Sequence, residues 1–139
     1  MKRSALRRNL PPKRPAYHAE WLVGRDYCWR CKWREGMPSE VWPRRMETHE
    51  LVRGPFRVKA FHLSYCWIRT CNECHAKHFA SMPLARQLAY KRLNNREHYD
   101  RRAVNLLRRR SPGAITEVEV LVEVRKLKLA GYVPEGGAE

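Results

Sequence analysis

The stretch Cys28-Trp29-Arg30-Cys31, matched in form by Cys71-Asn72-Glu73-Cys74, decides how this chain folds. Two thiolates separated by two residues on a tight turn reach one Zn²⁺ at about 2.3 Å, and two such turns complete a tetrahedral four-sulfur site. The alternative, a pair of disulfides, requires an oxidising compartment and an export signal. The basic first eight residues carry no apolar run of the kind that such a signal needs. The spacing therefore predicts a structural zinc ion.

The segment between the two cysteine pairs is too long for a simple zinc ribbon. It comprises the 39 residues from 32 to 70, whereas a ribbon has roughly 15–20. The sequence therefore predicts a folded insertion. Residue types indicate a strand over residues 45–52, a turn at residues 53–55 and a second extended segment near residues 56–60.

The chain after the second cysteine pair has helical patterns. Residues 75–80 can continue as a helix from the knuckle, and Pro83 opens a longer helix with an apolar side. The opposite side of that helix carries charged residues, Lys91 among them.

Two further helices are predicted towards the C-terminus. Asp100 is a suitable cap for a helix over residues 100–109. Over residues 116–129 the valines alternate as in a strand, but Thr116 and Glu119 have the spacing of a capping box. We therefore predict a helix there.

The length of 139 residues indicates one domain with appendages. We expect a basic disordered arm over residues 1–16, a zinc-bound core over 17–80, a helical extension over 81–130 and a flexible tail over 131–139. A small core needs bulky side chains, and we assign that role, in preference to base stacking, to the five tryptophans, Trp21, Trp29, Trp33, Trp42 and Trp67.

The charge of the chain points to a polyanionic partner. Lys and Arg number 29 against 14 Asp and Glu, a formal net charge of +15, and such a balance is typical of nucleic-acid binding. No stretch is long and apolar enough to span a membrane, and without an export signal we expect a cytoplasmic protein. The candidate phosphate-binding residues are Arg7, Arg8, Arg44, Arg45, Arg53, Arg108, Arg109 and Arg110.

The strand sequence Glu47-Thr48-His49-Glu50-Leu51 between the knuckles, with Cys74-His75 and His78 at the second, resembles the HNH, or ββα-metal, endonucleases. The resemblance covers residues 27–79. It implies an α+β fold: a small zinc-stapled ββα-metal core, here with a basic N-terminal arm and a helical C-terminal extension. It also implies a second, catalytic divalent ion, Mg²⁺ or Mn²⁺, and double-stranded DNA as the substrate.

On the family pattern, His49 and Glu50 occupy the strand positions of the general base and a metal ligand, in an order that the pattern leaves open. His75 and His78 occupy the positions of further ligands. Cys66 stands where the family has an asparagine that orients the base. Two functions therefore remain: an endonuclease that hydrolyses DNA phosphodiester bonds, or a non-catalytic zinc module that binds DNA or RNA, possibly on a degenerate HNH fold.

Overall fold

The computed structural model describes residues 14–52, 57–109 and 113–134 of the chain. Most of the predicted basic arm and the predicted turn at residues 53–55 lie outside these ranges. So do four of the candidate phosphate-binding residues, Arg7, Arg8, Arg53 and Arg110.

A two-stranded antiparallel sheet forms the centre of the molecule. Strand β1, Met46–Glu50, pairs with β2, Trp67–Cys71, so that Met46 lies opposite Cys71. The first predicted strand is confirmed, but the second was placed wrongly: Arg57–Ala60 forms the short helix α3. The run Trp-Ile-Arg-Thr-Cys of β2 consists mainly of aromatic and β-branched strand formers, and it ends at a cysteine of the second knuckle.

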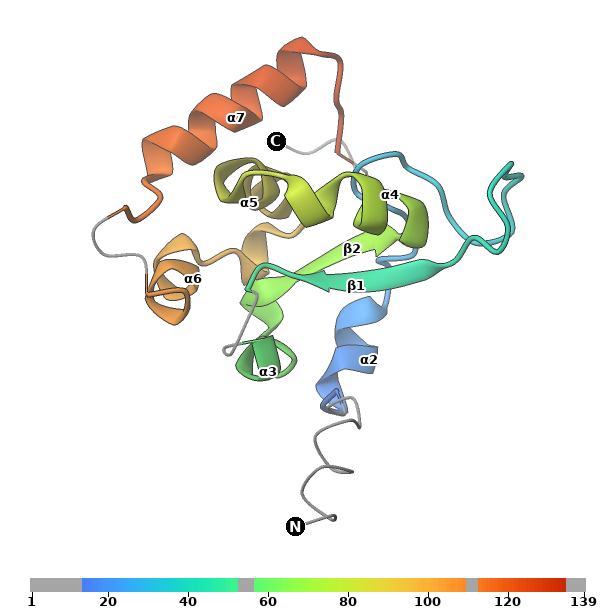
Figure 1. Cartoon of the computed structure of the whole chain (residues 1–139), viewed down its shortest axis with the longest axis horizontal. Helices are drawn as coiled ribbons and strands as arrows, with labels where there is room; N and C mark the ends of the chain where they lie inside the picture. Colours follow the sequence, from blue (N-terminus) through green and yellow to red (C-terminus); the bar gives the residue numbers. More distant parts are fainter. Residues whose placement is uncertain (1–13, 53–56, 110–112, 135–139) are drawn as a thin grey trace.

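Helices cover both faces of this sheet (Figure 1). Helix α4, Asn72–Lys77, follows β2 directly and lies on the same side as α5, Leu84–Asn94. Helices α2, Tyr17–Leu22, and α3 lie on the other side. The chain thus passes from β1 to β2 to α4, with the first cysteine pair before β1 and the second at the junction of β2 and α4.

The two C-terminal helices are confirmed where the sequence predicts them. Helix α6, Arg101–Leu107, is capped by the Asp100 carboxylate, which accepts from the Ala103 amide at 3.0 Å. Helix α7, Glu117–Leu129, begins at a complete capping box and packs on α5. The buried residues of α7 recur every three or four positions, as in a helix: Val120, Val124 and Leu127.

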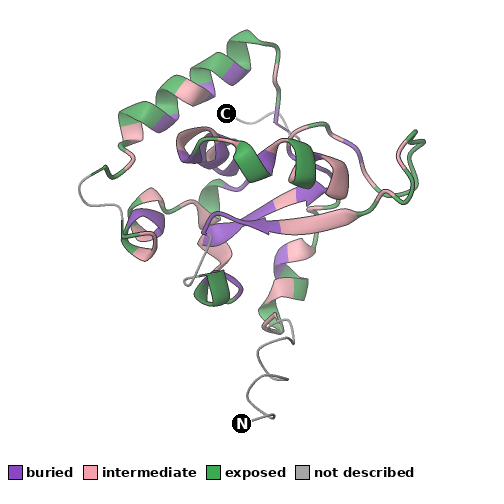
Figure 2. Cartoon of the chain, in the orientation of Figure 1, coloured by how far each residue is buried: buried purple, intermediate pink, exposed green. Residues whose placement is uncertain are grey.

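The tryptophans behave as core residues with one exception. Trp21, Trp29, Trp33 and Trp67 are at most 7% exposed, whereas Trp42 is 92% exposed. The prediction that Trp42 fills the core is therefore wrong. Trp42 lies in the loop before β1, which extends away from the rest of the molecule (Figure 1) and is largely exposed (Figure 2).

Lys91 was predicted to lie on the charged side of its helix, but it is fully buried. Its ammonium donates to the carbonyl oxygens of Ser64 at 2.8 Å and Trp67 at 2.7 Å, and to Asn95 Oδ1 at 2.6 Å. These acceptors replace the water that burial removes. Burial lowers the pKa of Lys91 well below its usual value.

The predicted flexible tail begins with packed residues. The Tyr132 hydroxyl donates to the Trp29 carbonyl and accepts from Asn94 Nδ2 at 2.8 Å. Within the described ranges, no helix has the length and apolar character needed to cross a bilayer.

The burial of His18 on α2 can be tested by measuring stability at different pH values. Burial, followed by the positive charges of Arg14 and Arg69, lowers the pKa of His18 from 6.5 to about 4. Below pH 6.5 the unfolded chain therefore binds more protons than the folded chain, and the free energy of unfolding falls as the pH falls towards about 4.

His18 Nε2 lies 3.0 Å from Thr48 Oγ1, and we expect His18→Gln, whose amide can still hydrogen-bond that hydroxyl, to reduce this pH dependence. The measurement is urea unfolding of both proteins at several pH values between 4 and 6.5, the range over which His18 titrates differently in the two states. Acid release of metal affects both proteins, so their difference isolates His18. Equal pH dependence in the two proteins would contradict the assignment.

Candidate metal centre and the adjoining polar site

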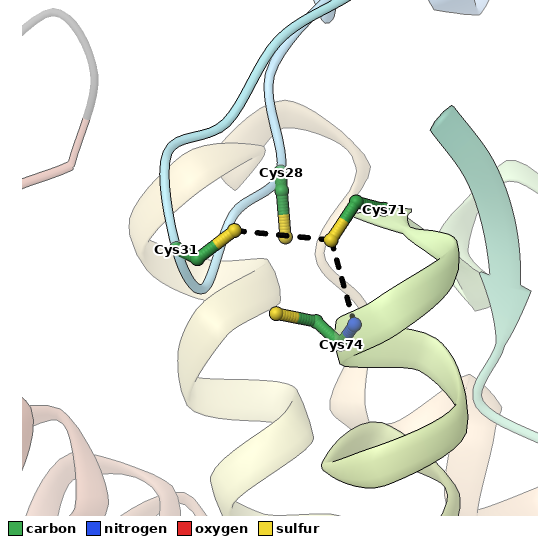
Figure 3. A group of neighbouring side chains, drawn as sticks. All are labelled: Cys28, Cys31, Cys71 and Cys74. Atoms are coloured by element: carbon green, nitrogen blue, oxygen red, sulfur yellow. Dashed lines mark hydrogen bonds between the residues drawn. The ribbon is translucent and has the colours of Figure 1, made fainter. Parts of the chain in front are cut away.

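Four cysteine sulfurs converge on one point between the first knuckle and the start of α4 (Figure 3). The sulfurs of Cys28, Cys31, Cys71 and Cys74 all lie within 4.8 Å of one another, and those of Cys31 and Cys71 are 3.8 Å apart. A tetrahedral zinc site with Zn–S bonds of about 2.3 Å has sulfurs about 3.8 Å apart. All five cysteines of the chain are free thiols. The predicted cysteine cluster is therefore confirmed as a group that can hold a metal ion.

Local structure holds each knuckle in place. In the first, the Cys28 amide donates to the Trp33 carbonyl at 2.7 Å, and Lys32 adopts a left-handed φ of 69° that closes the turn. In the second, Cys71 is the N-cap of α4, and its sulfur accepts from the Cys74 amide at 3.4 Å. The pairing of β2 with β1 sets where this N-cap lies.

Two arginines donate to the sulfurs from outside the cluster. Arg44 Nη2 lies 3.1 Å from Cys31 Sγ and 3.4 Å from Cys71 Sγ, and Arg30 Nη1 lies 3.7 Å from Cys74 Sγ. Four thiolates around Zn²⁺ carry a net charge of −2, which these guanidiniums offset. Arg44, a candidate for phosphate binding, is thus engaged with the metal centre.

Hydrogen bonds among the thiols shift their pKa values in opposite directions. Hydrogen bonds from the thiols of Cys31 and Cys74 lower the pKa of Cys28, whereas hydrogen bonds with Cys28 and Cys31 raise the pKa of Cys74. A divalent ion would bind all four sulfurs as thiolates and release their protons.

The predicted second set of ligands does not come together as a group. The Glu50 carboxylate is buried and forms an ion pair with Arg14, on the face of β1 opposite to His49. His78 follows α4, where burial and the charge of Arg30 lower its pKa. Among the described residues, the four cysteines are the only group of three or more metal-binding side chains that converge.

His49 and His75 do meet, across the space between β1 and α4. Their ring centroids are 5.0 Å apart and the rings are nearly perpendicular, at 77°. His49 is 5% exposed and also lies against Phe79, with ring centroids 5.6 Å apart. The candidate site therefore reduces to this pair of imidazoles and the groups that hold them.

Gln87 on α5 determines which nitrogen of His49 carries the proton. The Gln87 amide nitrogen donates to the carbonyl oxygens of Phe79 at 3.2 Å and Met82 at 2.7 Å. Its Oε1 must then accept from His49 Nε2, at 2.7 Å. The neutral His49 ring consequently has its lone pair on Nδ1.

Glu47 has the same effect on His75. Its Oε1 accepts from His75 Nδ1 at 3.0 Å, so that the neutral ring has its lone pair on Nε2. Metal-binding histidines commonly donate their second nitrogen to a carboxylate or carbonyl oxygen in this way. Both rings therefore have the partner that a ligand histidine requires.

Cys66 cannot orient a base as an asparagine would. It is fully buried, and burial raises the pKa of its thiol to about 12, so it remains neutral. A carboxamide contact to His49 comes instead from Gln87, which lies outside the stretch that resembles the HNH family.

The other candidate arginines in the described residues contact the protein itself and also add positive charge. Arg45 pairs with Glu47 at 3.1 Å, and Arg108 donates to the Leu51 carbonyl at 2.6 Å. Arg109 follows the C-cap of α6 and has a left-handed φ of 53°. Arg108 and Gln87 both line an open pocket of about 390 Å³, so this pocket borders the residue that holds His49.

Comparison of this chain with protein-family models, curated proteins and solved structures finds no match.

Sequence reasoning missed the roles of Glu47 and Gln87. Glu47 carries a detectable signal, because it lies two residues before His49 on a strand and so shares its face. Gln87 has no such signal, since its contact with His49 spans 38 positions and depends on how α5 packs.

Proposed function

We propose that this protein is a metal-dependent endonuclease of the ββα-metal type, which hydrolyses DNA phosphodiester bonds. The observation that carries the proposal is the pair His49 and His75, which meet edge to face between β1 and α4, each with one nitrogen hydrogen-bonded to an oxygen acceptor. The order β1–β2–α4, with four cysteines at the second strand's end, supports the same fold.

The catalytic ion would be held by His49 and His75. One or two protein ligands suffice for such an ion, because water and substrate phosphate fill the other positions. When bound, it would polarise the scissile phosphate and lower the pKa of a bound water. Imidazole suits Mn²⁺ better than Mg²⁺, which prefers oxygen ligands.

The protein's own groups have three tasks in this proposal. Gln87 and Glu47 hold the two imidazole rings in place through one nitrogen of each. His75, whose side chain is 32% exposed, presents the site to solvent, while buried His49 forms its inner side. The excess of basic residues, with Arg108 near the site, attracts and holds the phosphate backbone without reading sequence.

A second candidate is a non-catalytic zinc module that binds DNA or RNA. It is favoured by the engagement of Glu50 with Arg14 and by the neutral thiol of Cys66, because neither can serve the reaction as the family residues do. It shares the metal centre and the basic charge with the first candidate.

The deciding experiment is a plasmid-nicking assay with purified protein. We expect nicking in Mn²⁺, weaker nicking in Mg²⁺ and none in EDTA at a concentration that leaves the tightly held zinc in place, as metal analysis of the same sample verifies. Plasmid that is bound in a gel-shift assay but never nicked with either ion would establish the binding module instead.

A further inference from the structure

The loop before β1 contains a pocket that no role described so far uses. The open pocket has a volume of about 470 Å³, within the range of small-ligand sites. Trp33 and Trp42 both line it, together with Arg44 and Arg45. Trp33 is 7% exposed and Trp42 is 92% exposed, so one indole belongs to the core and the other is open to solvent.

The exposure of Trp42 has no explanation in the packing of the domain. The other four tryptophans are at most 7% exposed. A whole indole in water gives up the hydrophobic stabilisation that burial would supply. An exposed planar ring beside basic side chains is, however, the arrangement with which proteins stack unpaired nucleobases.

The charge around the pocket fits an anionic chain. Two guanidiniums, those of Arg44 and Arg45, line it against one carboxylate, that of Glu35, which is engaged with the Met46 amide at 3.2 Å. The Arg44 guanidinium lies over Trp33, 4.9 Å from the ring centroid, and reaches the zinc-site sulfurs. Arg45 has a side chain that is 58% exposed, so it can reach a phosphate.

The pocket is linked to the two-histidine site by a short series of contacts. Arg45 Nη2 lies 3.1 Å from Glu47 Oε2, and Glu47 Oε1 accepts from His75 Nδ1 at 3.0 Å. A strand held at the pocket therefore lies next to the site at which the backbone would be cut.

We infer that Trp42 and the pocket beside it bind an unpaired base of single-stranded or locally opened nucleic acid, with Arg45 on the adjoining phosphate. The cleavage of this strand rests on the proposed function, but the binding does not. The site thus favours a nucleic-acid strand whose bases can unstack from their neighbours.

The test is binding of a fluorescently labelled single-stranded oligonucleotide by the full-length protein at several salt concentrations. We expect Trp42→Ala to weaken binding about 5- to 140-fold, the range for loss of one stacked base. The slope of log K against log[salt] should stay unchanged, because no charge is lost. Arg45→Ala should instead reduce that slope by about 0.7.

Matched variants separate stacking from general surface change. Leu129→Ala removes another exposed apolar side chain, 77% exposed on α7, and should bind as the wild type does. Trp42→Phe keeps an aromatic ring and should recover most of the affinity. Equal binding by Trp42→Ala and wild type, or no oligonucleotide binding by wild type, would overturn the inference.

The two proposals fail in distinguishable ways. Oligonucleotide binding that depends on Trp42, without nicking in any metal, would remove the nuclease and keep the stacking site. Nicking by the wild type, together with equal oligonucleotide affinities of Trp42→Ala and the wild type, would keep the nuclease and remove the stacking site.

Discussion

Replacing Cys71 with serine is expected to abolish metal binding and with it the cooperative folding of the domain. Cys71 ends β2, caps α4 and contributes a sulfur to the cluster, so its loss affects three elements at once. Structural zinc contributes about 10–16 kcal/mol to folding in small zinc domains, which is comparable with the whole stability of a typical domain, about 5–15 kcal/mol. We expect one zinc per chain in the wild type and none in Cys71→Ser.

The measurements are metal analysis and thermal unfolding followed by circular dichroism. Cys66→Ala is the matched control, because Cys66 is equally buried but lies outside the sulfur cluster. It should keep its zinc and a cooperative transition, with a modest loss of stability. A Cys71→Ser protein that retains both stoichiometric zinc and the wild-type melting temperature would disprove the zinc assignment.

Replacing His49 with alanine is expected to remove nearly all cleavage while leaving the zinc centre intact. His49 supplies one half of the imidazole pair and is not a zinc ligand. In the proposed site His49 would be one of two protein ligands of the catalytic ion, so we expect its loss to cost at least as much as the loss of a general base, about 10²–10⁴-fold in rate. The measurement is the initial rate of plasmid nicking in Mn²⁺, with zinc content and DNA binding determined on the same samples.

Two further variants test whether the loss of cleavage is specific to the His49 site. Gln87→Ala keeps both histidines but removes the carboxamide that holds His49 Nε2, and loss of such an orienting partner typically costs about 10–100-fold. The Gln87→Ala substitution should also shift the dependence of the nicking rate on Mn²⁺ concentration. His62→Ala, on an exposed side chain away from the site, should nick as the wild type does. Unchanged cleavage by His49→Ala would show that another residue carries the reaction.

Local signals in the sequence predicted those features whose cause is also local. The capping box of α7 and the Asp100 cap of α6 join residues three positions apart, and both form as expected. The cysteine knuckles depend on the same kind of spacing, which is why the four-sulfur cluster could be predicted although 39 residues separate its halves. The excess of positive charge is a property of composition alone.

Tertiary structure decided which side chains are buried and which of them meet, because both depend on the element that packs against each residue. Lys91 and Trp42 exchange the places that their residue types suggest, since α5 turns Lys91 into the core and the loop before β1 carries Trp42 outwards. Adjacent strand residues point to opposite faces, so His49 meets His75 while Glu50 meets Arg14. The sequence by itself therefore determined the metal centre and the order of most elements. Only the packing of α4 and α5 on β1 decided which polar residues form the candidate site.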